Sequence, residues 1–325
     1  MNVLVTGGAG YIGSHAVKML DERGYGVVCL DNLVKGHREN VVGGVFYEGA
    51  VQDKGLVREI CTRHGIDAVM HFAAYSLVGE SVEMPINYYE NNVCNTLKLV
   101  ESVLGAGVKY LIYSSSAGVY GEPTNIPITE DAPCEPTNPY GRTKLYVEGI
   151  LNDIERARGL RYVSLRYFNA AGAHPDGTIG EDHDPETHLI PIVLDVALGK
   201  RESVTVFGND WPTRDGTCIR DYIHVCDLVD AHILALEYLL GGGKSTVFNL
   251  GNSKGYTVKE VIDTVSQVTG RSIKVEIGPR RLGDPAILVA SSDKIVRELG
   301  WRPKWASLGD IVETAWRWHR IRFEK

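Results

Sequence analysis

Short apolar runs alternate with amphipathic, helix-like segments through the first half of the chain. These runs occupy residues 2–6, 26–30, 45–47, 68–72, 110–114 and 162–167. Such alternation is typical of a parallel sheet that is covered by helices on both faces. The pattern therefore predicts an α/β fold built on a doubly wound parallel sheet, in which ligands bind at the carboxyl ends of the strands.

The pattern changes after about residue 170, where short mixed elements replace the regular alternation. A further apolar run at 247–251 predicts a strand that returns to the first sheet, and helical patterns follow near 257–269 and 307–320. We therefore expect one domain of residues 1–170, rejoined by a strand near 247–250, and a smaller C-terminal α/β domain of residues 171–325.

The first apolar run leads directly into a glycine-rich turn. Gly7, Gly8, Gly10 and Gly13 fit both G-x-G-x-x-G and G-x-x-G-x-x-G. These glycines let the backbone approach a pyrophosphate, and the helix that follows points its amides at the anion. The second run ends at Asp31, where a βαβ unit places the acid that binds the adenosine ribose and repels a 2′-phosphate. The sequence therefore predicts a Rossmann-type domain that binds NAD rather than NADP.

Composition and charge narrow the classes of partner. The chain has 325 residues, 44% of them hydrophobic, and a net charge of −7 with no basic run, which gives no sign of nucleic-acid or membrane binding. The six cysteines are scattered singly, as is typical of reduced thiols rather than of disulfides or a zinc site. The chain opens with a strand rather than a signal peptide. We therefore expect a cytoplasmic protein.

Hydroxyl and amine side chains follow the fifth apolar run. Ser114 and Ser116 stand at its end, and Tyr140 and Lys144 open a later helical segment. Tyr-x-x-x-Lys places both side chains on one helical face, one turn apart. An ammonium near a phenol favours the phenolate and lowers a pKa that starts at about 10, which suits a base. The pattern therefore indicates catalysis by Tyr140, with Ser116 bonded to the same substrate oxygen.

An acidic, histidine-containing run lies in the second half. Its members are Glu181, Asp182, His183, Asp184, Glu186 and His188. Oxygen and imidazole ligands are present, but the run lacks a fixed metal-binding spacing and hydride chemistry needs no metal. We therefore expect a solvated loop and no metal site.

These motifs resemble the extended short-chain dehydrogenase/reductase superfamily and, within it, the UDP-glucose 4-epimerases, also called UDP-galactose 4-epimerases. The similarity covers essentially the whole chain. Residues 6–15, 114–121 and 139–144 are shared across the superfamily, whereas 172–175 and 220–225 are more specific to the epimerases. The resemblance implies reversible epimerisation at C4 of a UDP-hexose, by transient hydride transfer to bound NAD and a 4-keto intermediate.

The resemblance also implies roles for individual residues. Ser116, Tyr140 and Lys144 would be catalytic. The residues that would bind NAD are Gly7, Gly10, Tyr11, Ile12, Gly13, Asp31, Asn32, Ala50, Val51, Phe72, Ala73, Ala74, Asn91, Ser114, Tyr140, Lys144, Tyr167 and Phe168. Those that would bind the UDP-sugar are Ser116, Tyr140, Asn169, His188, Leu189, Arg220, Arg281, Asp284 and Leu288. Two arginines suit a diphosphate because a guanidinium presents paired donors in a fixed fork.

Three positions bear on the affinity for NAD and on which sugar the site accepts. Ala50 stands where the family has an aspartate that binds the adenine amino group, and Ser76 stands where some members have a lysine near the cofactor phosphates. Both departures predict a weaker hold on NAD. Leu288 corresponds to a position that helps to decide whether a 2-acetamido sugar fits, and its bulk favours plain glucose and galactose.

The motifs are also compatible with functions other than epimerisation of a UDP-hexose. Other NAD-dependent sugar-nucleotide epimerases or decarboxylases fit the same motifs, and an NAD-sensing protein without turnover is the alternative from another class. Such sensors commonly lose the tyrosine or the lysine, so the intact Tyr140 and Lys144 oppose that alternative. The 4,6-dehydratases need an Asp-Glu pair after the strand-end hydroxyl, whereas Ala117 and Gly118 follow Ser116. The resemblance also implies a homodimer packed through helices near 92–105 and 143–156.

Overall fold

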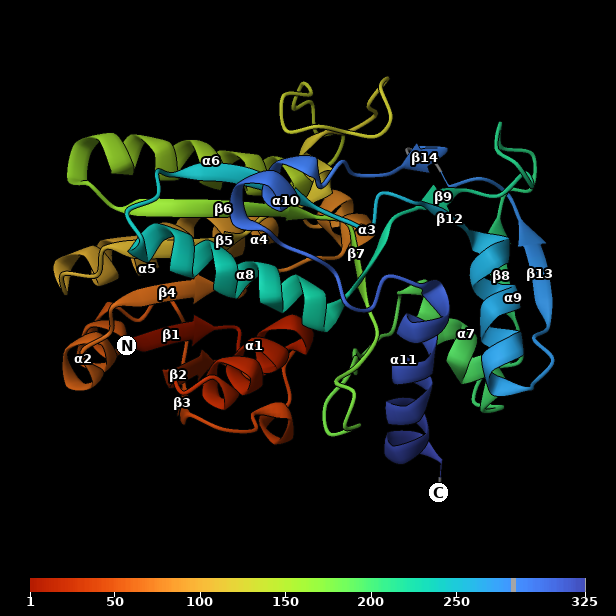
Figure 1. The fold of residues 1–325 in the computed structure, drawn as a ribbon, viewed down its shortest axis with the longest axis horizontal. Coiled ribbons are helices and arrows are strands. Elements are labelled where there is room, and N and C mark those ends of the chain that lie inside the picture. The colour runs from red at the N-terminus through yellow and green to blue at the C-terminus, as the bar shows by residue number, and fades with distance from the viewer. Residues whose placement is uncertain (282–284, 325) are drawn as a thin grey trace.

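The first region of the protein is built on a seven-stranded sheet in which all neighbouring strands are parallel (Figure 1). The computed structural model describes residues 1–281 and 285–324. From edge to edge the strands are β3 (Val45–Glu48), β2 (Gly26–Asp31), β1 (Asn2–Thr6), β4 (Ala68–His71), β5 (Tyr110–Ser114), β6 (Arg161–Tyr167) and β11 (Thr246–Leu250). This order confirms the predicted Rossmann-type, doubly wound α/β fold.

Helices cover both faces of this sheet. α1 (Tyr11–Glu22) and α8 (Val225–Leu240) pack on one face, and α2 (Lys54–His64), α5 (Asn95–Gly105) and α6 (Pro139–Arg158) pack on the other. Side chains alternate between the two cores because successive strand residues point to opposite faces. Val3 and Val5 of β1 therefore lie in the core beneath α1 and α8, and Leu4 lies in the core beneath α2 and α5.

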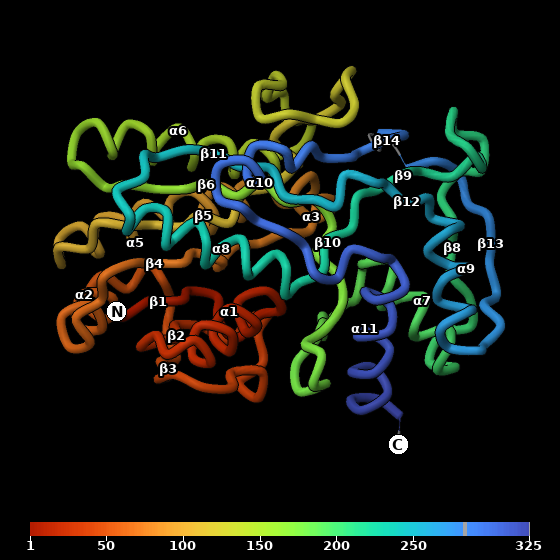
Figure 2. The backbone as a smooth tube through the Cα atoms, viewed as in Figure 1, coloured from red at the N-terminus to blue at the C-terminus, as the bar shows by residue number. Residues whose placement is uncertain are grey.

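The second region lies at one end of this sheet (Figures 1 and 2). α7 (Leu189–Ala197), α9 (Val258–Thr269) and α11 (Leu308–Phe323) enclose a separate core. Three small sheets complete it among the described residues. They are β8 (Val204–Phe207) with β13 (Val275–Gly278), β7 (Asn169–Ala171) with β10 (Tyr222–His224), and β12 (Tyr256–Thr257) with β9 (Ile219–Arg220) and β14 (Ile287–Leu288). The predicted helices near 257–269 and 307–320 correspond to α9 and α11.

The chain crosses between the two regions more than once. The expected strand near 247–250 is β11, which pairs in parallel with β6 from Thr246 opposite Val163 to Leu250 opposite Tyr167. α10 (Asp293–Leu299) then returns to pack beside β11. Each region is therefore assembled from separate stretches of sequence. Over the part of the chain that is described, no helix is both long and apolar enough to cross a membrane.

Candidate active site

Each glycine of the first turn has a distinct steric role. Gly7 has a positive φ of 74°, and a Cβ there would lie 2.6 Å from the Ala73 nitrogen. A Cβ on Gly13 would lie 2.1 Å from the Gly7 oxygen, so these two glycines are required for close packing of the turn. A Cβ on Gly10 would meet only the Gly7 oxygen, at 3.4 Å. Gly10 is the N-cap of α1 and leaves the helix amides accessible to an anion.

Asp31 connects the second strand to the glycine turn. Its Oδ2 accepts a hydrogen bond from the Ala9 nitrogen (3.0 Å), and its Oδ1 accepts one from the Leu33 nitrogen (2.8 Å). The side chain is buried, whereas the neighbouring Asn32 is exposed. A carboxylate has about four lone-pair sites, so Asp31 can hold the turn and still accept ribose hydroxyls.

The other residues expected to contact NAD follow the ends of neighbouring strands. The backbone nitrogens of Phe72 and Ala73 donate to the Thr6 oxygen at 3.0 and 3.1 Å, which joins the ends of β4 and β1. Ala50 and Val51 follow β3 and are half-buried. Asn91 lies in a π-helical turn (Glu90–Cys94), a distortion that is frequent at functional sites. These positions share the carboxyl edge of the sheet, as the fold predicts.

Ser116, Tyr140 and Lys144 meet where β5 ends and α6 begins. Asn138 caps α6 by accepting from the Gly141 nitrogen at 2.9 Å, and a Cβ on Gly141 would lie 2.3 Å from the Gly118 oxygen. The helix start is thereby pressed against the turn that follows Ser116. The Lys144 Nζ is buried and lies 5.8 Å from the centroid of the Tyr140 ring.

Burial dominates the protonation of this pair. Burial raises the pKa of Tyr140, and only the hydrogen bond with Ser116 works in the other direction. Burial lowers the pKa of Lys144 to about 7, although the charge of Glu148 opposes this shift. The predicted lowering of the Tyr140 pKa by Lys144 is therefore not found in the protein alone, because desolvation favours the neutral form of both groups.

A buried polar network lies one helical turn beyond Lys144. Glu148 accepts hydrogen bonds from the Ser115 hydroxyl (2.6 Å) and from Arg166 Nε (3.0 Å) and Nη2 (2.5 Å). Arg166 also donates to the Tyr120 hydroxyl at 2.9 Å. The network fixes α6 against β5 and β6. Glu148 is a site residue that was not predicted from the sequence, although its position four residues after Lys144 places both side chains on one face of α6.

A cavity of about 290 Å³ in the second region gathers most of the residues expected to bind the UDP-sugar. Its predicted lining residues are Asn169, His188, Leu189, Arg220 and Arg281. The cavity is connected to the end of β5 over a short distance, because the Tyr167 hydroxyl lies 2.5 Å from the Ser114 Oγ and Asn169, which lines the cavity, follows two residues later. Phe168, between them, packs beside the Val119 and Tyr120 cluster.

The cavity also contains residues that the sequence analysis missed. Arg201 adds a third arginine to its lining, and Phe207 lies beneath Arg281, whose guanidinium carbon is 3.9 Å from the ring centroid. Arg201 follows α7 without a motif, so only the fold could identify it. Leu288 lies beside the cavity in β14, where it is the strand partner of Arg220. Asp284 lies outside the described residues.

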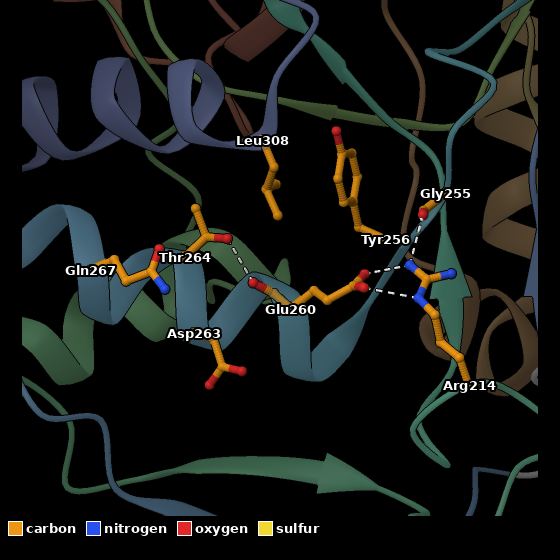
Figure 3. A pocket seen from close by; sticks show the side chains of 8 residues that line it. All are labelled: Arg214, Gly255, Tyr256, Glu260, Asp263, Thr264, Gln267 and Leu308. Carbon is orange, nitrogen blue, oxygen red and sulfur yellow. Dashed lines mark hydrogen bonds and ion pairs between the residues drawn. The ribbon is translucent and has the colours of Figure 1, made fainter.

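A second cavity, of about 380 Å³, lies against α9 (Figure 3). Figure 3 shows Arg214 engaged by the Glu260 carboxylate, with a 2.8 Å bond from Nε, while its Nη2 donates to the Gly255 oxygen at 3.0 Å. The charge of Arg214 is thus already paired. Within the described chain, none of the predicted site residues lines this cavity, whereas five of those expected to bind the UDP-sugar line the other one.

The expectation of a solvated acidic loop is wrong. Glu181 is only 6% exposed. The His188 Nδ1 lies 2.8 Å from the Glu181 Oε1 and 3.1 Å from the Glu186 Oε1, and His183 joins the same cluster. His188 lines the cavity of about 290 Å³, but its imidazole faces these carboxylates. The sequence could not reveal this because the residues converge only when the loop folds back on itself.

The comparisons with known proteins agree with this geometry. The model of the NAD dependent epimerase/dehydratase family matches residues 3–251. The chain is 58% identical to UDP-glucose 4-epimerase of Halalkalibacterium halodurans over 98% of this chain and 96% of that protein. It is similar to a crystal structure of a UDP-glucose 4-epimerase, with a TM-score of 0.97, 53% identity, and coverage of 99% and 98%. It is also similar to the crystal structure of a Bifidobacterium longum UDP-glucose 4-epimerase in complex with NAD⁺ and UDP, with a TM-score of 0.93, 40% identity, and coverage of 99% of this chain and 98% of that chain.

Proposed function

The chain belongs to the NAD dependent epimerase/dehydratase family, and from that premise we propose that it interconverts UDP-galactose and UDP-glucose by epimerisation at C4. The observation that carries this proposal is the junction at Ser114, which joins Lys144 on one side to Tyr167 and the arginine-lined cavity on the other. Residues 1–170 together with β11 would then form the NAD-binding domain, and residues 171–325 would supply most of the UDP-sugar site.

The residues present fit a bound NAD. Gly10 leaves open space at the start of α1, and Asp31 retains lone pairs toward the ribose. Bound NAD supplies the acceptor for the hydride of the sugar C4. Tyr140 would act as the phenolate, whose oxygen takes the proton of the 4-hydroxyl group to become the phenol and later returns that proton. The phenolate and the ammonium form of Lys144 stabilise each other in a buried site, because opposite charges attract, and this offsets the burial that favours the neutral form of each group.

The arginine-lined cavity would let the substrate stay bound while its sugar ring turns over to present its opposite face to NAD. Arg201, Arg220 and Arg281 can hold the diphosphate by charge-assisted hydrogen bonds, while the hexose makes looser contacts and turns about its phosphate link as a 4-keto sugar. Binding energy is thereby placed on the part of the substrate that does not react. The hydride and the proton then return to the opposite face.

The direct test is a conversion assay. Purified protein is incubated with UDP-galactose, first without added cofactor and then with NAD⁺, and the nucleotide sugars are separated. We expect UDP-glucose to form at least after NAD⁺ is added. Binding of NAD⁺ without any UDP-glucose would reject the proposal and favour the alternative of a non-catalytic NAD-sensing protein.

Sugar choice is proposed from one side chain. Leu288 is the strand partner of Arg220, so its bulk lies next to the substrate cavity. We therefore expect UDP-glucose and UDP-galactose to be preferred over their 2-acetamido counterparts. Comparable turnover of UDP-N-acetylglucosamine would contradict this expectation, and Leu288→Ser is the variant expected to admit it.

A homodimer is proposed through the helices that include α5 and α6. Several apolar side chains are exposed on α6 and on the preceding α3 (Val78–Glu83) and α4 (Pro85–Tyr89), including Ile86 (77%), Val82 (62%) and Tyr146 (51%). Contiguous exposed apolar surface marks interaction sites. Sedimentation should give twice the chain mass, and Ile86→Asp should shift the protein toward the monomer. A monomeric wild-type protein would reject the dimer.

A cytoplasmic location is proposed from the cysteines. The six thiols are free, and Cys29, Cys61, Cys218 and Cys226 are buried, as expected in a reducing compartment. Fractionation of source cells tests this location, and recovery outside the cytoplasm would overturn it.

A further inference from the structure

Four side chains of the loop at residues 181–188 point their donor atoms toward one another. We propose that Glu181, His183, Glu186 and His188 bind one divalent transition-metal cation, with Zn²⁺ as the best fit. Each residue offers one ligand atom, and these atoms lie within 4.8 Å of one another. The site lies outside the hydride chemistry and does not depend on the proposed function.

The donor atoms are spaced closely enough to converge on a single cation. The His183 Nδ1 lies 3.3 Å from the Glu181 Oε1 and 3.7 Å from the Glu186 Oε2. The His188 Nδ1 lies 2.8 Å from the Glu181 Oε1 and 3.1 Å from the Glu186 Oε1. Zinc bonds to nitrogen and oxygen of about 2.0–2.2 Å place tetrahedral ligands roughly 3.3–3.6 Å apart. The four separations of 2.8–3.7 Å are of this order, so the donor atoms could converge on one cation after the shorter pairs move apart.

Unsatisfied buried atoms provide an independent observation. The Glu181 Oε1 and the His183 Nδ1 are both buried, and neither has a hydrogen-bond partner of acceptable geometry among the described residues. Glu181 is more than nine-tenths buried. These atoms approach one another closely but are not aligned as donor and acceptor. The Glu181 Oε1 is at ion-pair distance from both histidine nitrogens but accepts a well-aligned hydrogen bond from neither, and a shared cation would satisfy these converging lone pairs.

Backbone contacts orient the Glu186 carboxylate. Its Oε1 accepts hydrogen bonds from the Thr187 and His188 nitrogens, both at 2.7 Å. The Oε2 is the oxygen nearest to His183. Such outer contacts are what hold a carboxylate ligand in place at metal sites. Two imidazoles with two carboxylates suit Zn²⁺, whereas Ca²⁺ and Mg²⁺ prefer oxygen ligands throughout.

A second cluster of similar composition provides the contrast. Glu22, His174 and Asp176 also bring their donor atoms together. There, however, the Lys18 ammonium lies 2.9 Å from Glu22 and 3.0 Å from Asp176. The lysine already supplies the positive charge that these carboxylates need. The cluster at 181–188 has two histidines where this cluster has a lysine, and a neutral imidazole, unlike an ammonium, can bind a metal ion.

The position of the loop indicates a structural role for the ion. The Arg322 Nε of α11 donates a hydrogen bond to the Asp182 Oδ2 at 3.0 Å. The His37 Nε2 lies 3.0 Å from the backbone carbonyl oxygen of Asp182. The His183 ring lies 6.2 Å from that of Tyr11 in the glycine turn. A cation here would fix the loop between α11 and the dinucleotide turn and thereby set the position of His188 at the substrate cavity.

The test measures metal binding by the full-length protein. Protein treated with a chelator is dialysed against graded ZnCl₂, and bound zinc is measured by elemental analysis. We expect one equivalent per chain for the wild type, at least a tenfold loss of affinity for His183→Gln and for Glu186→Gln, and wild-type binding for the matched control His174→Gln. Co²⁺ should give the visible absorption of a four-coordinate ion.

Thermal unfolding separates loss of the site from loss of the fold. Zn²⁺ should raise the Tm of the wild type and of His174→Gln, because a ligand that binds only the native state stabilises it. It should not raise the Tm of His183→Gln. Wild-type protein that retains less than one equivalent of zinc, or that binds zinc no more tightly than His183→Gln, would overturn the proposal whatever the stability of the variants.

Discussion

Lys144 Nζ donates a 2.7 Å hydrogen bond to the carbonyl oxygen of Ser114, at the carboxyl end of β5. This bond holds the Lys144 amine beneath the start of α6, where only 3% of the residue is exposed. Burial lowers the pKa of Lys144 to about 7, so the ammonium form destabilises the folded state.

Lys144→Met should therefore stabilise the protein and inactivate it. The folded-state pKa of about 7 lies below the unfolded value of about 10.4. The unfolded state thus binds more protons between these values, and the cost of burying the charge is largest below pH 7 and is relieved as the pH rises toward 10. We expect the variant to gain about 1–2 kcal/mol in unfolding free energy at pH 6, as measured in urea. A variant less stable than the wild type at pH 6 would contradict the expectation.

Tyr140→Phe should remove the base without removing the substrate site. We expect kcat to fall about 10²–10⁴-fold while the affinity for UDP-sugar changes little, because the phenyl ring keeps its packing and the arginine-lined cavity is untouched. Tyr146→Phe is the matched control, since this tyrosine lies on the same helix but is half exposed. Full activity in Tyr140→Phe would refute the assignment.

Ala50→Asp should tighten the hold on NAD. A carboxylate at this half-buried position after β3 can accept a hydrogen bond from the adenine amino group, and a hydrogen bond to a charged group contributes about 1.5–3 kcal/mol. We expect at least a tenfold higher affinity, measured as NAD retained after dialysis. Stoichiometric retention of NAD by the wild-type protein through the same dialysis would show that Ala50 does not weaken binding.

His71→Gln should reduce the acid sensitivity of the fold. His71 is fully enclosed between the Thr6 hydroxyl (2.7 Å) and the Thr96 hydroxyl (2.9 Å), and burial lowers its pKa to about 3, with a further contribution from Lys144. The unfolded value is about 6.5, so stability falls as the pH drops from 6.5 toward 3, by about 1.4 kcal/mol per pH unit. Glutamine can keep both hydrogen bonds without titrating. Equal slopes for the two proteins in urea titrations from pH 6 to 4 would reject this role.

The fold was predictable from sequence because its signals are local. The strand ending at Asp31, the glycines at 7, 10 and 13, and the start of α6 at Pro139 each depend on residues close together in the chain. The return of β11 was also visible as an isolated apolar run. Local patterning of this kind agrees with the tertiary structure wherever a strand or helix buries a continuous face.

The site was only partly predictable, because much of it depends on long-range packing. Arg201 enters the cavity from the loop after α7, and no motif marks it. The convergence of Glu181 with His188 required a loop that folds back on itself, and the shifted pKa of Tyr140 depends on how completely it is desolvated. Side-chain chemistry was readable from the sequence, whereas burial and mutual distance were not.

The pairing of β11 with β6 has a consequence for synthesis. The ribosome delivers β6 with Tyr167 long before it delivers Thr246, the first residue of the partner strand. During that interval the nascent sheet ends in an unpaired edge of apolar residues, which is a template for association with other chains. Translation speed between these two positions should therefore influence the yield of folded protein, and a chain ended shortly after residue 170 would carry the same exposed edge permanently.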